Sequence, residues 1–195
     1  ESEVIDAMQK LTNTLQSQGR ESAAYTTLAQ AIMPMLSYYQ KLSGYNDIVF
    51  ISLNGDIIFS VMNANKIESV YEAVLNNRKS ELSEAFIKAK ASQSIEISNF
   101  ENHAELREGV IFIVAPIFKQ ANLIGFIACE ISSKGVYEFV QDHANLGNTG
   151  EAVIVSKINE EMVFITPLRF SLDAAFKKKI KSKSREGREI EKALK

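Results

Sequence analysis

The chain has 195 residues, 46% of them hydrophobic, a length that supports one well-developed core and part of a second because domains commonly hold roughly 100–200 residues. The formal charge of −2 is unevenly distributed: residues 176–195 hold nine Lys and Arg against three Glu, or +6, which leaves −8 for the preceding residues. This distribution excludes a uniformly basic surface for nucleic acid.

Apolar residues recur every three or four positions over residues 4–42, which predicts one long helix or two helices in line. The pattern is interrupted only at residues 16–22, where polar residues and Gly19 dominate. A continuous helix would be roughly 60 Å long at 1.5 Å per residue. Pro34 is expected to bend it and Gly44 to cap it in the left-handed conformation. Such a helix is expected to pack along the following domain or to pair with a copy of itself.

Two runs rich in β-branched and aromatic residues, 48–53 and 56–61, flank Asn54-Gly55. Asn-Gly between such runs is the strongest short-range hairpin signal, so a strand pair is predicted here. After a polar loop, residues 67–91 carry apolar side chains on one face and predict an amphipathic helix, or two shorter helices divided at Asn76-Asn77.

Residues 94–100 alternate between apolar and polar and predict a half-exposed strand. Residues 101–108 are expected to form a charged loop. The nearly continuous apolar runs 109–118 and 123–131 predict a second hairpin with central strands covered on both faces. Five antiparallel strands with flanking helices indicate an α+β sheet domain.

The last part of the chain repeats the opening of a sheet domain and then stops. A helix is predicted from residue 133, a hairpin from 152–156 and 162–165, and a short helix over 172–180. Two strands cannot bury both faces, so this part is expected to be marginally stable. The predicted organisation is a long N-terminal helix at residues 1–44, a sheet domain at 45–132 and an incomplete second sheet domain at 133–195.

Several classes of site are disfavoured by the residues themselves. Cys129 is the only cysteine, which excludes an intramolecular disulfide and a thiolate metal cluster, and it is expected to be a small core residue. His103 and His143 lack the spacing of a zinc site, so no metal or other cofactor is expected. No Ser-His-Asp set, P-loop or dinucleotide fingerprint is present. We therefore expect the chain not to be an enzyme.

The sequence also indicates whether membrane-spanning or signal segments are present. No stretch approaches the ~20 consecutive apolar residues of a membrane-spanning helix, and Glu-Ser-Glu does not begin a signal sequence. As given, the chain is expected to be soluble. Its start without Met inside a helical pattern predicts a piece of a longer protein.

Three segments carry a resemblance to a known family. Residues 45–57 resemble the first strand pair of extracytoplasmic PAS-like sensor domains of the Cache type, and residues 114–118 followed by 123–127 resemble their paired late strands. Leu146-Gly147-Asn148-Thr149-Gly150-Glu151 followed by Pro167-Leu168-Arg169 is similar to the entry into the membrane-proximal half of double Cache modules. The resemblance covers most of the chain, and its proximal half lacks the later strands of the family.

The resemblance implies a fold and a role. In that family a long first helix continues from a transmembrane segment, the membrane-distal domain binds a small molecule, and a second transmembrane helix leads to a cytoplasmic output. The output is a histidine kinase, a diguanylate cyclase or phosphodiesterase, or a chemotaxis signalling rod. The amino-acid-binding variant of the family uses a Tyr, Arg and Trp-Tyr cluster. The present chain has no Trp, which weighs against amino-acid recognition by that route.

By analogy with the family, the pocket is expected between the helix that ends near Phe86 and the exposed face of the three later strands. Arg78 and Arg107 are expected to bind a carboxylate, although a solvated surface position is the alternative for each. Asn99 stands where relatives carry Asp, which favours a neutral or anionic ligand. The expected ligand-binding residues are Tyr71, Arg78, Ser98, Asn99, His103, Arg107 and Phe112.

The sequence thus predicts an extracytoplasmic small-molecule sensor domain of a bacterial signal-transduction receptor. It is expected in the periplasm, membrane-anchored in the full-length inner-membrane protein, and homodimeric through its N-terminal helix. Nucleic acid is not an expected partner. The alternative is a non-sensing dimerisation or spacer module of such a receptor.

Overall fold

A computed structural model describes residues 2–62, 80–103, 108–134, 137, 140, 146–148, 150–158 and 160–193. The chain divides into two compact units, of which the first holds residues 1–99 and 111–131 and the second holds 100–110 and 132–195. The helices are α1 (Ser2–Gln18), α2 (Ala23–Ser43), α4 (Glu81–Ser92) and α6 (Arg185–Ala193). The strands are β1 (Asp47–Ile51), β2 (Ile57–Ser60), β3 (Glu96–Ile97), β4 (Glu101–His103), β5 (Glu108–Lys119), β6 (Asn122–Ser132), β7 (Val155–Ile158), β8 (Glu161–Phe164) and β9 (Lys179–Lys181).

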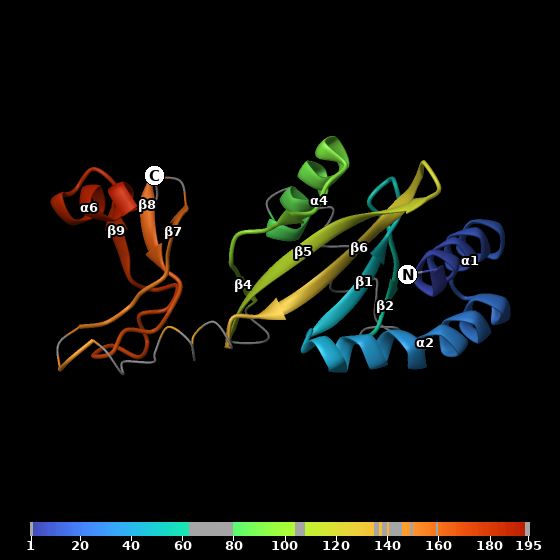
Figure 1. Ribbon diagram of the computed structural model, residues 1–195, viewed down its shortest axis with the longest axis horizontal. Coiled ribbons are helices and arrows are strands. Elements are labelled where there is room, and N and C mark those ends of the chain that lie inside the picture. The colour runs from blue at the N-terminus through green and yellow to red at the C-terminus, as the bar shows by residue number, and fades with distance from the viewer. Residues whose placement is uncertain are drawn as a thin grey trace. The chain divides into compact units, whose positions relative to one another are not determined.

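A six-stranded sheet has the order β2-β1-β6-β5-β3, with β4 paired to β5 (Figure 1). The first unit contains β1, β2, β3 and most of β5 and β6, whereas β4 and the start of β5 belong to the second unit. The pairs β1–β2, β1–β6, β3–β5 and β4–β5 are antiparallel. Strands β1 and β2 meet through the predicted Asn54-Gly55 turn, where Gly55 has φ +97°. The α+β class predicted from the sequence is confirmed.

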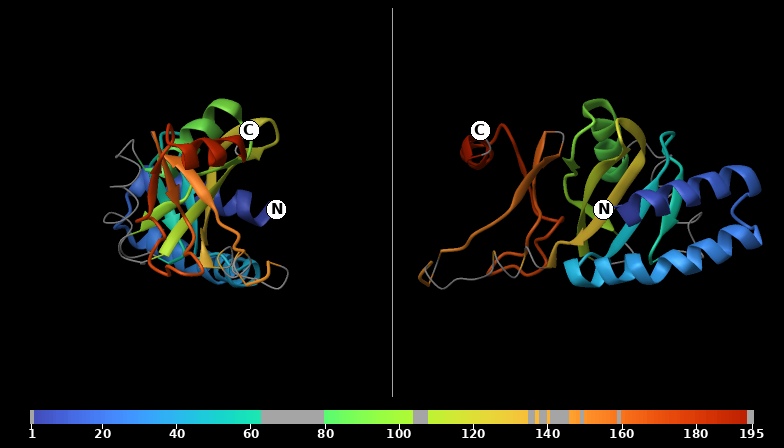
Figure 2. Two further views of the ribbon diagram at one scale, coloured as in Figure 1. Left: turned by 90° about the vertical axis from the view of Figure 1, so that its left-hand side faces the viewer. Right: turned by 45° about the vertical axis from the view of Figure 1, so that its right-hand side comes forward.

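Two helices precede the sheet, and they are not in line. Helix α1 ends before Gly19, whose φ is +81°, and α2 begins after Ser22, whose side chain accepts the Tyr25 N–H at 3.1 Å. The two helices contact each other and run back side by side (Figure 2). The predicted in-line arrangement is therefore wrong. The predicted left-handed cap at Gly44 is confirmed, with φ +71°.

The helical pair folds back because both helices bury apolar residues on the same side of the sheet. Met8 and Leu11 of α1 are 0% exposed, and Leu36 of α2 is 1% exposed. They share one core cluster with residues of β1 and β2. Burial of such side chains contributes roughly 1.5–3 kcal/mol each, which far exceeds the gain from continuing a helix through a polar segment. The buried members of this cluster are Ala7, Met8, Leu11, Tyr25, Leu36, Ile48, Phe50, Ile58, Phe59, Val61 and Ile117.

Helix α4 overlaps the stretch 67–91 that was predicted to be helical. Residues 67–79 of that stretch lie outside the described part of the chain. The Ser80 side chain accepts the Ser83 N–H at 3.1 Å and caps α4, which ends at Gln93 with φ +50°. Residues 101–103 were expected in a loop and instead form β4. This strand pairs residue by residue with the first three positions of β5, so hairpin pairing with the next strand overrides its polar composition.

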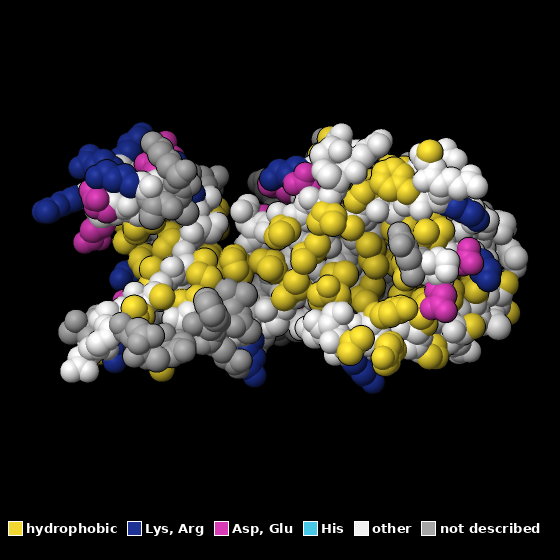
Figure 3. Space-filling model, viewed as in Figure 1, with side chains coloured by type: hydrophobic (Ala, Val, Ile, Leu, Met, Phe, Trp, Pro, Cys, Tyr) yellow, Lys and Arg dark blue, Asp and Glu magenta, His cyan; other side chains and the backbone are white. Residues whose placement is uncertain are grey.

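The second unit contains a three-stranded sheet in the order β7-β8-β9. The predicted hairpin is confirmed, with Val155 opposite Phe164. The predicted helix over 172–180 is wrong: residues 172–178 form turns, and β9 follows because Ile180 pairs opposite Met162 on β8. The third strand also corrects the expected two-stranded arrangement. Lys and Arg side chains lie beside Asp and Glu side chains over α6 (Figure 3).

Candidate functional site

One face of the six-stranded sheet points away from α1 and α2. Neighbouring residues of a strand alternate between faces, and Phe50 belongs to the core under the two helices, so Val49 and Ile51 point the other way. The β1–β6 register places Val49 opposite Ala128 and Ile51 opposite Phe126, and all four are 0% exposed. We call the face of the sheet that carries these four residues the α4 face.

Helix α4 covers one end of the α4 face. The ring of Phe86 meets the Phe126 ring edge to face, with 5.1 Å between centroids and 75° between planes. A Cβ atom added to Gly55 would lie 3.3 Å from the Phe86 ring, so the β1–β2 turn closes over the same aromatic group. Leu82 and Ala85 are buried beside it, at the spacing of one helix face. This end of the face is therefore packed and apolar.

The other end of the α4 face is polar. Asp47 lies opposite Glu130 in the β1–β6 register, and the two residues are 2% and 4% exposed. Cross-strand partners share a face of the sheet, so two carboxyl groups lie beyond Val49 and Ala128. This end of the face is therefore buried and polar.

The Asp47 carboxylate joins the start of β1 to the end of β2. Its Oδ1 accepts the N–H groups of Ile48, Val61 and Met62 at 2.7, 3.1 and 3.0 Å, and its Oδ2 accepts the Ser60 hydroxyl at 2.6 Å. Burial raises the pKa of Asp47 above its usual value, while the Ser60 hydroxyl and the backbone N–H groups lower it. These hydrogen bonds give Asp47 a structural role at the start of β1.

Glu130, like Asp47, is a group of the α4 face that the sequence interpretation did not assign to the site. It is the only charged residue within the apolar run 123–131, and that position was the available signal. The Asn46 N–H donates to the Glu130 backbone oxygen at 2.8 Å, and the Asn46 side-chain amide donates to Glu130 Oε1 at 3.4 Å. These contacts hold the start of β1 against β6 and keep the carboxylate at the polar end of the face.

Three of the seven predicted ligand-binding residues are described with their side chains, and they lie together at the β3–β5 edge. The Ser98 N–H donates to the Phe112 oxygen at 2.9 Å, and the Ser98 hydroxyl accepts the Phe112 N–H at 2.9 Å. The Asn99 N–H donates to Glu81 Oε2, at the start of α4, at 3.2 Å. Phe112 is 1% exposed and Asn99 is exposed. Ser98 and the Asn99 backbone therefore have structural contacts.

The other four predicted residues lie outside the described part of the chain, wholly or with their side chains. Tyr71, Arg78 and Arg107 lie outside the described residues. The backbone of His103 belongs to β4, opposite Glu108, and its side chain lies outside the described part of the chain. Their place at the site stays a prediction.

Replacing Ser98 with Ala is expected to loosen this edge without unfolding the unit. The variant loses the acceptor of the Phe112 N–H and the donor to the Asn99 oxygen at 2.6 Å. One such network contributes about 1 kcal/mol. Urea denaturation should show a fall of that size. Ser94→Ala is the control, because its exposed hydroxyl donates to another exposed hydroxyl, that of Ser92, at 2.8 Å, and such a bond contributes little. Equal stability of the two variants would contradict the structural role of Ser98.

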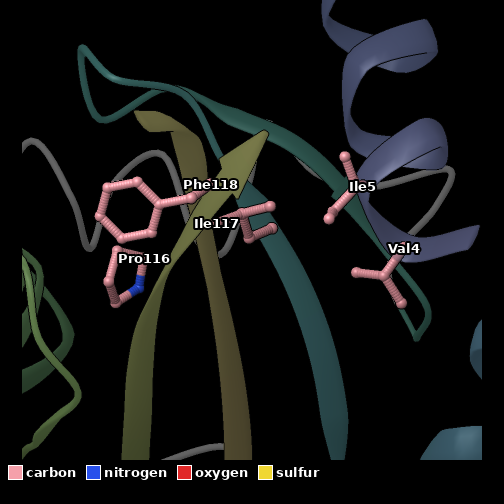
Figure 4. A pocket seen from close by; sticks show the side chains of 5 residues that line it. All are labelled: Val4, Ile5, Pro116, Ile117 and Phe118. Atoms are coloured by element: carbon pink, nitrogen blue, oxygen red, sulfur yellow. The ribbon is translucent and has the colours of Figure 1, made fainter. Parts of the chain in front are cut away.

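An apolar pocket lies on the opposite side of the sheet from the α4 face. It has a volume of about 290 Å³ and is lined by Val4, Ile5, Pro116, Ile117 and Phe118. Ile5 and Ile117 point toward each other across it (Figure 4). Its lining contains no polar side chain that would orient a polar ligand. The sequence predicted a pocket on the α4 side, and this one lies between α1 and the end of β5.

The described residues contain no group of three or more His, Cys, Asp or Glu placed to hold a metal ion. None of the described helices is both long and apolar enough to cross a membrane. Cys129 packs against the core under α1 and α2, and burial raises the pKa of its thiol to about 11. It is therefore a protonated thiol at neutral pH, as expected for a small core residue.

No family model and no curated protein matches the sequence. Among solved structures, the ligand-binding domain of the Pseudomonas fluorescens chemoreceptor CtaA in complex with L-serine is 11% identical, with a TM-score of 0.50, over 90% of this chain and 66% of that one. The V. cholerae histidine kinase DctB sensor domain is 14% identical, with a TM-score of 0.48, over 71% and 49%. The Campylobacter jejuni chemoreceptor Tlp3 ligand-binding domain in complex with L-norvaline is 14% identical, with a TM-score of 0.46, over 83% and 74%.

The likeness to the CtaA domain shows the fold of this chain. It agrees with the fold that the sequence resemblance implied. The chain spans about two thirds of the CtaA domain and about half of the DctB domain.

Proposed function

We propose that this chain is an extracytoplasmic small-molecule sensor domain of a bacterial signal-transduction receptor. The observation that carries the proposal is the first unit: a sheet in the order β2-β1-β6-β5-β3, in a fold shared with the CtaA ligand-binding domain. At one end of its α4 face, the Asp47 and Glu130 carboxyl groups are buried and have hydrogen-bond partners within the protein. The shared fold supports binding of a small solute, and a binding rather than a catalytic role is proposed.

The proposed ligand is a neutral or anionic small solute. Ser98, Asn99 and Phe112 lie beside the start of α4, which supports a shared location for part of the proposed set. Tyr71, Arg78, His103 and Arg107 complete that set, and the two arginines are proposed to bind a carboxylate of the ligand. Of the set, Phe112 offers an apolar surface and the others offer polar groups.

A thermal-shift screen against amino acids, carboxylates, amines and purines tests the proposal. A ligand present at 100 times its Kd stabilises the folded state by about 2.7 kcal/mol. For a chain of this size such stabilisation should raise Tm by roughly 5–10 °C. No shift with any of the four classes contradicts a sensing role.

The proposed arginines have a matched control. Arg78→Ala and Arg107→Ala are each expected to remove the shift caused by an anionic hit while leaving the ligand-free Tm close to that of the wild type. Arg188→Ala, an exposed position of α6, should keep the full shift. An unchanged shift in both test variants would remove these residues from the proposed site and leave the sensing role standing.

The receptor context belongs to the same proposal. The full-length protein is proposed to be membrane-anchored, with this domain in the periplasm and a homodimer formed through the N-terminal helices. Ligand binding favours one of two arrangements of those helices, and the difference in affinity for the two arrangements sets the largest signal.

A non-sensing dimerisation or spacer module is the second candidate. It is favoured by Tyr38 and Leu42 of α2, which are 62% and 70% exposed. Removing the whole N-terminal region would also remove core residues such as Met8, so the matched test is Tyr38→Ser with Leu42→Ser. Loss of a dimer in sedimentation equilibrium, together with no ligand shift in the wild type, would favour the spacer.

A further inference from the structure

The turn between α1 and α2 interrupts a regular series of apolar residues, and the spacing of the series is the same on both sides of the turn. The apolar positions 4, 8, 11 and 15 of α1 and 25, 32, 36 and 39 of α2 belong to one series of alternating four- and three-residue steps, which passes through 18, 22 and 29. This is the heptad spacing of a helix with one buried stripe. A continuous helix over residues 2–43 would therefore keep all these apolar positions on one side.

Local interactions hold the turn closed. The Gly19 N–H donates to the Leu15 oxygen at 3.0 Å, and the Ser22 hydroxyl donates to the Gly19 oxygen at 2.8 Å. Gly19 has φ +81°, a conformation that residues with a side chain rarely adopt, and a Cβ atom there would meet no heavy atom within 4 Å. Space therefore does not require glycine at this position, and only the backbone conformation of the turn does.

One side chain of the turn fastens it to the edge of the sheet. Arg20 donates to the backbone oxygens of Ile57 and Ile58 of β2, at 3.4 Å for the latter. Its guanidinium lies 5.7 Å from the centre of the Tyr25 ring, and the Tyr25 hydroxyl donates to the same Ile58 oxygen at 2.5 Å. Arg20 thus holds the helical hairpin closed over the outermost strand.

Helix α1 cannot leave the sheet without exposing a fitted surface. Met8 and Leu11 are 0% exposed. A Cβ atom at Gly125 would lie 1.9 Å from Met8 Cε, so the glycine on β6 makes room for this one side chain. If the turn straightens, the same fit is restored only by the α1 of a second copy of this chain, because that copy carries the same side chains.

We propose that residues 19–22 are a hinge, and that its opening exchanges α1 between two copies, each α1 packing on the other copy's sheet. Reciprocal exchange keeps the contacts of Met8 with the Gly125 site and replaces the turn by a continuous helix. The inference rests on the homodimer of the proposed function and specifies how that dimer forms. The proposed exchange does not depend on ligand binding, so it is tested on the ligand-free protein.

Sedimentation equilibrium of the complete chain tests the hinge. The double variant Gly19→Ala with Arg20→Ala removes the left-handed glycine and the fastening to β2. Ala favours a helix interior over Gly by a factor of about five per chain, so a dimer with two open hinges should gain about 25-fold or more in its association constant. Circular dichroism should show a parallel rise in helix content.

The second unit supplies a matched control. Gly147 has φ +64° with nothing within 4 Å of its Cβ position, and Arg169 donates to the oxygens of Gly147 and Gly150 at 2.8 and 3.0 Å. Gly147→Ala with Arg169→Ala therefore repeats the same chemistry away from the hinge and should leave association unchanged. An association constant of the hinge variant equal to that of the wild type or of this control overturns the hinge.

Complementation separates exchange from ordinary pairing. Met8→Glu places a charge on the buried side of α1. Gly125→Val fills the space on β6 into which Met8 packs. When the two variants are refolded together, an exchanged heterodimer contains one intact α1 on one intact sheet, and its Tm should exceed that of either variant alone. Dimer formation by the hinge variant without recovery in the mixture would overturn exchange and leave the proposed homodimer standing. If neither single variant folds, their joint recovery or failure gives the same decision.

Discussion

Replacing Asp47 with Ala is expected to lower the free energy of unfolding by about 2–3 kcal/mol. The carboxylate accepts three backbone N–H groups and the Ser60 hydroxyl, and Asp47 itself is 2% exposed. A buried donor without an acceptor costs about 1–3 kcal/mol, and more than one donor is affected. The free energy lost with these hydrogen bonds is expected to exceed the gain from no longer burying a carboxylate charge. Urea denaturation followed by circular dichroism measures the difference.

Asp47→Asn is the matched variant. Its side-chain oxygen can take the place of Oδ1, which receives all three N–H groups, and its amide can donate to Ser60 Oγ in place of accepting from it. We therefore expect Asp47→Asn to keep most of the stability that Asp47→Ala loses. Equal destabilisation by both changes would contradict the hydrogen-bond explanation and point to packing.

The difference in stability between the wild type and Asp47→Asn is expected to depend on pH. Burial raises the pKa of Asp47 in the folded state, so the folded state holds this proton more tightly than the unfolded chain, whose Asp pKa is about 3.9. The contribution of Asp47 to stability therefore falls as pH rises from about 3.9 through the raised value, and is level above it. The stability of wild type minus that of Asp47→Asn should fall over this range. A difference that rises with pH would contradict the raised pKa.

Gly125→Ala is expected to destabilise the first unit by roughly 2–3 kcal/mol. The added Cβ would lie 1.9 Å from Met8 Cε and 2.8 Å from the Ile51 backbone oxygen. Met8 can move, but it is 0% exposed, and the Ile51 oxygen belongs to the neighbouring strand β1. Overpacking of this kind costs about 1–3 kcal/mol, and the φ of +156° adds backbone strain. The midpoint of urea denaturation should fall accordingly.

A double-mutant cycle identifies the cause. Met8→Ala alone should cost about 2–5 kcal/mol through the cavity it leaves. Combined with Gly125→Ala, it should cost less than the sum of the two, because the new methyl group occupies part of that cavity. Gly147→Ala, with open space around its Cβ position, should cost only roughly 1 kcal/mol of backbone strain. Strict additivity of the cycle would contradict the contact between α1 and β6.

The candidate site was only partly predictable from the sequence. Ser98, Asn99 and Phe112 were expected near one another and are adjacent at the β3–β5 edge. The carboxyl groups of Asp47 and Glu130 were not assigned to the site, because 83 residues separate them along the chain and only the β1–β6 register places them opposite each other. A sequence pattern indicates which residues of a strand share a face, but it does not identify the neighbouring strand or its register.

The elements with strong local signals were predicted correctly. Asn54-Gly55 defines a hairpin through the backbone of the turn, and Gly44 ends α2 through its left-handed conformation. The errors fell where local preference is weak. The segment 172–180 has helical spacing, yet Ile180 pairs with Met162 in a sheet. Residues 101–103 are polar, yet they pair with β5.

By itself, then, the sequence determined the α+β class, the positions of the main hairpins and the extent of the apolar faces, because turn residues and side-chain periodicity act within a few positions of one another. Tertiary structure alone decided that α1 folds back beside α2, that β9 is a strand, and that Asp47 lies opposite Glu130. These outcomes depend on which apolar surface a segment buries and which strand edge it pairs with, and both depend on residues far away in the chain.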